Sequence, residues 1–140
     1  MSHMNLAVLW IRGEDEELSA LLAKVAYTPA KNWRKGDARG LRGTHQSSGF
    51  SIVIADSNYP GEMMEKVRAF LADCISRNVD FVANGLSAEF SIGVTVGSDP
   101  QFIVSVDLKT EDLTLLGSIG IALSICAYPS ADDGERSCAP

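Results

Sequence analysis

The residues best suited to contact a ligand lie in one basic segment, Lys24 to Arg42. It holds six of the chain's twelve Lys and Arg residues, although the whole chain carries a formal charge of −6. An indole beside several cations can stack on a base or another ring while the cations bind phosphate or carboxylate. The residues in this segment that suit such chemistry, and that we take as the candidate binding residues, are Trp33, Arg34, Lys35, Arg39 and Arg42.

Three interpretations of this segment stay open. In the first, Trp33 packs against the domain and the basic side chains pair with the acidic turn Glu14–Glu17. In the second, the segment binds another protein, because Trp and Arg dominate the energetics of protein interfaces. In the third, it binds an anion, nucleotide or RNA, with Trp33 stacked on a base and Arg34, Lys35 and Arg39 on phosphates. The segment is not a P-loop, since the glycine spacing and the Lys-Ser/Thr ending are missing.

Residues for catalysis or metal binding form no recognisable set. Consecutive carboxylates in Glu14–Glu17 point in different directions on a helix and suit the positive end of its dipole, and no EF-hand spacing is present. No GxSxG motif supplies a serine nucleophile that His45 could activate as a general base. Cys74 is expected on the apolar face of a helix. The sequence therefore predicts no metal site and no cofactor, and it favours a non-enzymatic role.

Length and composition predict one globular domain. The chain has 140 residues, an ordinary size for a domain, and 46% of them are hydrophobic, more than in disordered chains. The net charge argues against general nucleic-acid binding, which needs a basic footprint, without excluding a small patch. The apolar runs are too short to span a membrane. We expect a domain at residues 5–129, a flexible tail at 130–140 and a remnant of cloning at 1–4.

The three cysteines are Cys74, Cys126 and Cys138. An odd number without a CxxC pair predicts neither a disulfide framework nor a zinc site. We expect two buried or half-buried thiols and one thiol in the tail, which fits a reducing cytoplasm. The N-terminus lacks a charged segment followed by an apolar one, so no signal peptide is expected.

Hydrophobic periodicity predicts the elements that carry the basic segment. Alternation predicts strands at 5–12, 50–55, 90–97, 102–108 and 121–126, with a short one at 80–85 and a hairpin loop at 97–100. Helical spacing predicts two main helices, at 14–25 and 63–75, and a short one at 111–116.

These elements predict an α+β fold. Two amphipathic helices need one apolar sheet face to cover, so a two-layer sandwich is the simplest arrangement. We expect a mixed, largely antiparallel sheet of about five strands with the two main helices on one face. Ser, Gly and Thr alternate with apolar residues in the 90–97 strand, so part of the opposite face is expected to be open to water or to a partner.

The chain resembles an uncharacterised bacterial family of domains of unknown function. The resemblance rests on Arg12-Gly-Glu-Asp-Glu-Glu-Leu18 before a helix that ends near Thr28-Pro29, on Trp33-Arg-Lys-Gly-Asp37, and on the C-terminal stretch Leu113–Tyr128. Residues 83–97 fall outside it. The resemblance implies a single α+β domain and transfers no catalytic residue.

We predict a non-catalytic binding or protein-interaction domain of a bacterial cytoplasm. An immunity-like protein that occludes the basic active site of a toxin is one form, because the charge of −6 suits a basic partner. Its contact surface would then be acidic. An anion-, nucleotide- or RNA-binding module is the first alternative, and a small enzyme whose residues converge only in the fold is the second. The expected partner is another protein, no membrane is involved, and the oligomeric state is left open.

Overall fold

Five strands form one sheet in the computed structural model, which describes residues 3–130. The first two residues of the predicted cloning remnant and the predicted tail beyond Ser130 lie outside the described residues. The elements in chain order are β1 (Asn5–Gly13), α1 (Asp15–Lys24), β2 (Lys31–Trp33), a 3₁₀ turn η1 (Gly40–Arg42), β3 (Ser48–Asp56), α2 (Pro60–Ser76), β4 (Ser87–Val96), α3 (Thr110–Ile119) and β5 (Ile121–Pro129).

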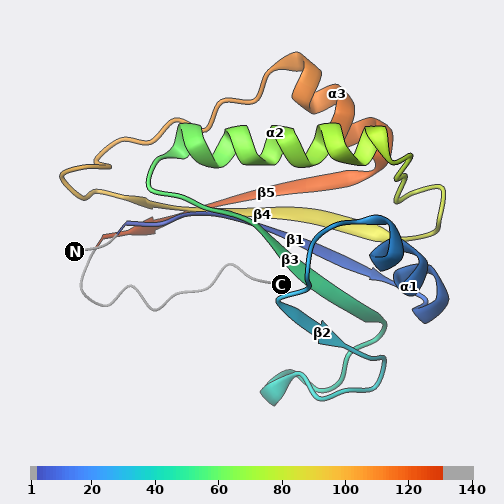
Figure 1. Cartoon of the computed structure of the whole chain (residues 1–140). Helices are drawn as coiled ribbons and strands as arrows, with labels where there is room; N and C mark the ends of the chain where they lie inside the picture. Colours follow the sequence, from blue (N-terminus) through green and yellow to red (C-terminus); the bar gives the residue numbers. More distant parts are fainter. Residues whose placement is uncertain (1–2, 131–140) are drawn as a thin grey trace.

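The strand order is β2-β3-β1-β4-β5. The pairs β2–β3, β3–β1 and β1–β4 are antiparallel, and β4–β5 is parallel. Helices α2 and α3 lie along one face of this sheet (Figure 1), and α1 packs on β1 and β3. The predicted α+β sandwich with a mixed, largely antiparallel sheet is confirmed. Within residues 3–130, no helix combines the length and the apolar character needed to cross a membrane.

The core lies between the sheet and the helices. Alternate residues of the central strands are buried there, including Leu9 and Ile11 of β1, Ile52 of β3 and Phe90 of β4. They pack under the apolar face of α2, whose buried residues are Met63, Met64, Val67, Phe70, Leu71 and Cys74. Strands whose side chains alternate in this way send every second residue to the opposite face. The core therefore determines which side chains face away from the helices.

The strand and hairpin predicted at 97–108 are wrong. Both edges of β4 are already paired, with β1 and with β5, so no ladder position is left for a hairpin partner. The chain leaves β4 at Gly97, which has a positive φ of 86°. The buried side chain of Gln101 then holds the turn, because its Nε2 donates to the Thr95 carbonyl (2.8 Å) and its Oε1 accepts from Asn5 (2.6 Å).

Two smaller predictions also fail. Residues 80–85 form turns rather than a strand, with Gly85 at a positive φ. Conversely, the basic segment contains the short edge strand β2, which pairs Lys31 with Ser51 and Trp33 with Gly49. This pairing places Trp33 on the sheet, where its surroundings are set by β3 and β1.

Candidate functional site

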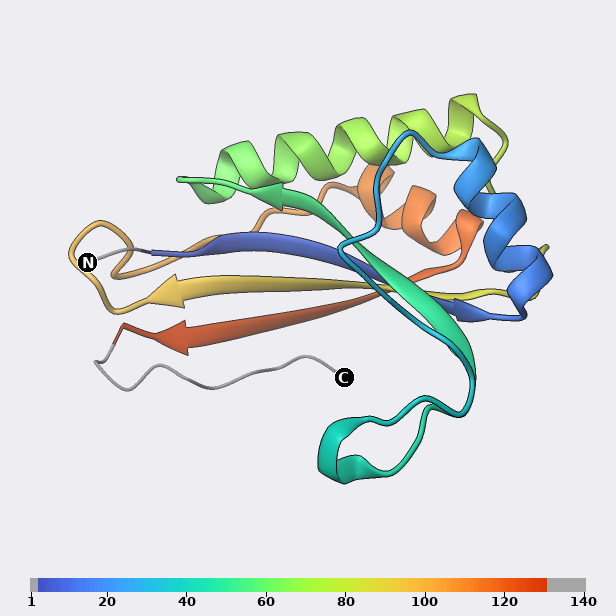
Figure 2. The ribbon, with the colours of Figure 1, turned by 60° about the horizontal axis from the view of Figure 1, so that its bottom comes forward.

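The sheet face opposite the helices is the candidate site, and we call it the open face. No described helix lies on it, as Figures 1 and 2 both show. A groove of about 240 Å³ runs across this face. It is lined by Met4, Leu6, Val8, Trp10, Ala30, Lys31, Ser51, Val53, Ser91, Gly93 and Tyr128. The sequence-based expectation that Ser91 and Gly93 belong to a face away from the helices agrees with this geometry.

Trp33 is half-buried at the edge of the open face. Its Nε1 donates a hydrogen bond to the Ser47 carbonyl at 3.1 Å. Its ring lies against the backbone of Gly49, where a Cβ atom would come within 2.5 Å of Trp33 Cζ2. A glycine is therefore required opposite this indole, because any larger residue would push the ring away from the strand.

A row of three rings crosses this edge of the sheet. His45 stacks on Trp33 with ring centroids 4.9 Å apart at 19°, and Trp33 lies 5.9 Å from Trp10 at 42°. We call His45, Trp33 and Trp10 the aromatic row. The guanidinium of Arg12 lies 6.0 Å from the Trp33 ring, and the ammonium of Lys31 lies 6.0 Å from the Trp10 ring. These distances are at the outer limit for cation–π attraction.

Of the predicted basic residues, Arg34 partly follows the packing interpretation. Its guanidinium forms an ion pair with Asp15 at 3.6 Å, and the two side chains are 78% and 60% exposed. An ion pair this exposed contributes little stability because water screens it. Trp33, Arg34 and Asp15 also border a second groove of about 260 Å³ between α1 and β2. The acidic turn therefore neutralises one cation of the basic segment.

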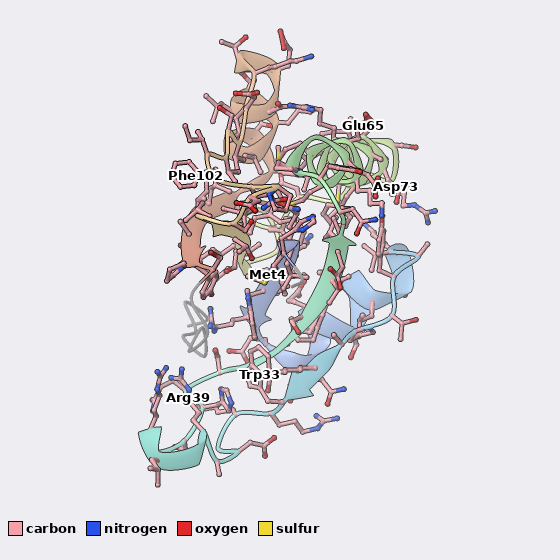
Figure 3. The ribbon with its side chains drawn as sticks, turned by 90° about the vertical axis from the view of Figure 1, so that its left-hand side faces the viewer. Met4, Trp33, Arg39, Glu65, Asp73 and Phe102 are labelled. Carbon is pink, nitrogen blue, oxygen red and sulfur yellow. The ribbon has the colours of Figure 1, made fainter. Side chains whose placement is uncertain are left out.

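The other three basic residues lie on a hairpin that extends from β2 and β3. Backbone bonds between Gly36 and His45 and between His45 and Asp37, at 2.9 and 2.8 Å, hold its base. Lys35 and Arg42 are exposed and form no ion pair within residues 3–130, whereas Arg39 is half-buried. Figure 3 shows Arg39 towards the outer end of the hairpin and Trp33 nearer the sheet. Lys35, Arg39 and Arg42 thus share one projection, whereas Trp33 lies on the sheet and Arg34 pairs with Asp15 of α1.

Sequence reasoning missed two parts of this surface. Leu41 is fully exposed at the tip of the hairpin, between Arg39 and Arg42. Trp10 is 23 positions from Trp33, and only the pairing of β1 with β3 and of β3 with β2 brings the two rings together. The alternation of residues 6, 8 and 10 against 7, 9 and 11 was visible in the sequence, but apolar residues on both faces hid which set is exposed.

The structure does not bring His45 and Cys74 together. His45 stacks on Trp33 at the open face, while Cys74 is buried under α2 on the other side of the sheet. Burial and the carboxylate of Asp73 raise the pKa of the Cys74 thiol from 9.0 to about 12, despite the opposing effect of Arg77. The thiol therefore stays protonated at neutral pH and is a poor nucleophile. No group of three or more potential metal ligands occurs in the part of the chain that is described.

The expectation that all three cysteines are reduced is wrong for Cys126, which is disulfide-bonded. Cys126 lies on β5 opposite Gly93 and shares the open-face side with Tyr128, since side chains two residues apart on a strand point the same way. Cys74 is free, as expected. Widely spaced cysteines carry no signal of pairing, so only the fold reveals this bond.

Comparison with known families places this chain in a group of domains of unknown function. The family model described as "Domain of unknown function (DUF4279)" matches residues 2–130, most of the chain. No curated protein and no solved structure gives a match. The candidate site must therefore be interpreted from its own chemistry.

Proposed function

The chain belongs to the DUF4279 family, and we propose that it is a non-catalytic protein-interaction domain whose partner docks on the open face. The observation that carries this proposal is the groove lined largely by apolar side chains on a sheet face that no described helix covers. Exposed apolar surface that is rimmed by polar groups is typical of protein interaction sites. Val53, which lines the groove, is 42% exposed.

The chemistry of the partner follows from the side chains around the groove. Trp10 and Trp33 provide large, rigid contact area at its edge, and such residues carry much of the binding energy in interfaces. Arg12 and Lys31 flank the rings, and the hairpin adds Lys35 and Arg42. We therefore propose a partner segment that is apolar along the groove and acidic beside the aromatic row.

A pair of matched charge substitutions tests the docking surface. Val53→Glu introduces a carboxylate into the groove, and Ile75→Glu introduces one at a similarly exposed apolar position (45%) on α2. In affinity capture from the source lysate at micromolar concentration, we expect a saturable protein partner to bind the wild-type chain and Ile75→Glu but not Val53→Glu. Equal retention by all three proteins would exclude the open face, and the absence of any saturable partner would refute the proposal.

An immunity-like role is the narrower form of this proposal. The net charge of −6 supports it in sign, because such a chain attracts a basic partner. The contact surface would then include carboxylates such as those of Glu14–Glu17 rather than the aromatic row. The charge of the captured partner separates the two forms: an acidic partner supports docking at the open face, and a basic partner supports the immunity-like form. We propose a bacterial cytoplasm as the setting in either case.

Anion or RNA binding at the hairpin is the second candidate function. The exposed side chains of Lys35 and Arg42, unpaired within residues 3–130, favour it. Stacking of a base on Trp33 is less favourable, because His45 already occupies one face of the indole. Titration of Trp fluorescence with nucleotides and short RNA at low and high salt tests it in a Trp10→Phe background. Salt-sensitive quenching of Trp33 that disappears in Arg34→Ala would favour this candidate over protein binding.

A further inference from the structure

Strand β5 forms one edge of the sheet, and no described strand lies beyond it (Figure 2). It pairs with β4 at every position from Ile121 to Pro129, without an irregularity. None of these residues is charged. A long, regular and uncharged edge pairs readily with a further strand, because its backbone groups are evenly spaced and no charge repels the incoming chain.

The ladder with β4 shows which backbone groups of β5 point outward. The N–H of Ser130 donates to the Val96 carbonyl of β4 at 2.9 Å. Backbone groups alternate between the two edges of a strand, so the even-numbered residues face β4 and the odd-numbered ones face away from it. The N–H and C=O groups of Leu123, Ile125 and Ala127 therefore lie on the free edge. They form no hydrogen bond within residues 3–130.

The opposite edge of the same sheet is protected against pairing. Strand β2 has only three residues, of which Lys31 and Asn32 are exposed. Its neighbour β3 carries a bulge opposite Ala7 and Val8. Short strands, lysines and bulges are the usual features that keep sheet edges from pairing. Strand β5 has none of them before its last residue, Pro129, so the contrast marks β5 as the edge that accepts a strand.

We propose that β5 pairs with β5 of a second copy of this chain, antiparallel and about a two-fold axis at Ile125. The three outward-facing residues are symmetric about this position. Ile125 then pairs with its own equivalent, and Leu123 pairs with Ala127 of the second copy. Facing residues of this kind exchange both of their N–H···O bonds. Pro129 faces outward without an N–H, so the pairing ends before it.

The side chains on this edge are complementary to themselves, as a two-fold interface requires. Ile125 is 47% exposed and would lie directly opposite its equivalent, where two apolar side chains bury each other. Leu123 would face a small Ala127. Each chain carries a net charge of −6, so two copies repel each other over most orientations. Contact through an uncharged strand keeps the carboxylates apart and is the orientation in which this repulsion is least.

The symmetry of the dimer has a consequence for the open face. A two-fold axis that relates edge strands in one continuous sheet stands perpendicular to that sheet. Both copies therefore turn the open face to the same side and the helices to the other. A partner with two docking segments then binds both grooves at once and gains avidity. This consequence rests on the proposed function, whereas the dimer itself does not.

Sedimentation equilibrium of the full chain under reducing conditions tests the dimer and excludes a disulfide between chains. We expect a mass twice the 15.0 kDa of one chain at micromolar concentration. Ile125→Lys places two ammonium groups opposite each other and should weaken association about tenfold or more. Ile75→Lys, at a similarly exposed position (45%) on α2, should associate like the wild type. Far-UV circular dichroism checks that both variants are folded. A monomeric wild type, or equal association of the two variants, would overturn the proposal.

Amide hydrogen exchange resolved by residue tests the pairing without any substitution. In the dimer, the outward amides of Leu123, Ile125 and Ala127 should exchange as slowly as the inward amide of Ser124. Dilution to the monomer should speed the first three several-fold and change Ser124 much less. A dimer in which these three amides exchange fast has its interface elsewhere, and protection that appears only with a captured partner assigns the edge to that partner; either result contradicts the proposal. Failure to capture any partner would instead refute the proposed function and leave the dimer standing.

Discussion

Substitution of Gly49 by alanine should destabilise the protein and displace the Trp33 ring from its position against the Gly49 backbone. The added Cβ would lie 2.5 Å from the Ile11 carbonyl oxygen, 2.5 Å from Trp33 Cζ2 and 2.8 Å from Trp33 Cε2. Ordinary contacts need roughly 1 Å more than this, and the paired backbones of β1 and β3 resist a shift because close-packed interiors transmit strain. The indole must therefore move, and the contact with the Ile11 oxygen requires a local shift of the paired strands as well.

The magnitude follows from three contributions. Overpacking of this kind costs about 1–3 kcal/mol, and loss of the bond from Trp33 Nε1 to the Ser47 carbonyl adds about 0.5–1.5 kcal/mol. The φ angle of Gly49 lies outside the left-handed region, so alanine also gains about 0.4–1 kcal/mol from reduced freedom of the unfolded chain. We expect the free energy of unfolding to fall by about 1–3 kcal/mol.

Urea denaturation followed by far-UV circular dichroism measures this change, and Trp fluorescence in a Trp10→Phe background reports the position of Trp33. The matched control is Gly117→Ala in α3, where a Cβ meets no atom within 4 Å. The same replacement there should stabilise the protein by about 0.5–1 kcal/mol, since alanine favours a helix over glycine. A Gly49→Ala protein with wild-type stability and an unchanged emission spectrum would refute the argument that the strand backbone seats the indole.

Three further predictions concern charge. Asp112→Asn should lower the free energy of unfolding by about 1–3 kcal/mol in urea denaturation, because Asp112 is buried and accepts from Arg68 Nε at 3.1 Å; Glu62→Gln, at an exposed pair, should cost under about 0.5 kcal/mol. Arg34→Gln should likewise change the urea midpoint little, since its ion pair is exposed. The raised pKa of Cys74, about 12 against 9.0, gives a contribution to stability that is complete below pH 9 and is lost towards pH 12. Cys74→Ala should therefore show a smaller alkaline loss of stability than the wild type, and the native Cys74 thiol should resist iodoacetamide until the chain unfolds.

The main elements were predictable because each buries one face of a regular structure. Alternation marked β1, β3, β4 and β5, and the three- and four-residue spacing of Met63 to Cys74 marked α2. These signals are local, so they do not depend on knowing the strand order. The same alternation misled at residues 102–108, where Val104, Val106 and Leu108 pack partly buried against the core without joining the sheet. Periodicity reports that a side is buried, and it does not report whether a ladder partner exists.

Only part of the candidate site was predictable, because the pairing and register of the strands bring its residues together. Charge and an isolated aromatic pointed to Trp33 and the basic hairpin from composition alone. Trp10, Val53 and Tyr128 come from three other strands, and they share one face only because of the order β3-β1-β4-β5. A three-residue strand such as β2 is too short to show alternation. The groove was therefore beyond the reach of sequence patterns.

The position of Trp33 is compatible both with a residue packed against the sheet and with an exposed contact residue. Its seat on Gly49 and its bond to Ser47 are structural, yet the same ring borders the groove between α1 and β2 and contacts Trp10 on the open face. A ring held on one side and half-exposed on the other loses little conformational entropy on binding, which is the physical advantage of a preorganised contact. Loss of Trp33 should consequently weaken partner binding and stability together, whereas Val53→Glu should weaken binding with a much smaller effect on stability. Observation of that separation would support the proposed docking surface on the sheet and the proposed role of Trp33 in fixing its edge.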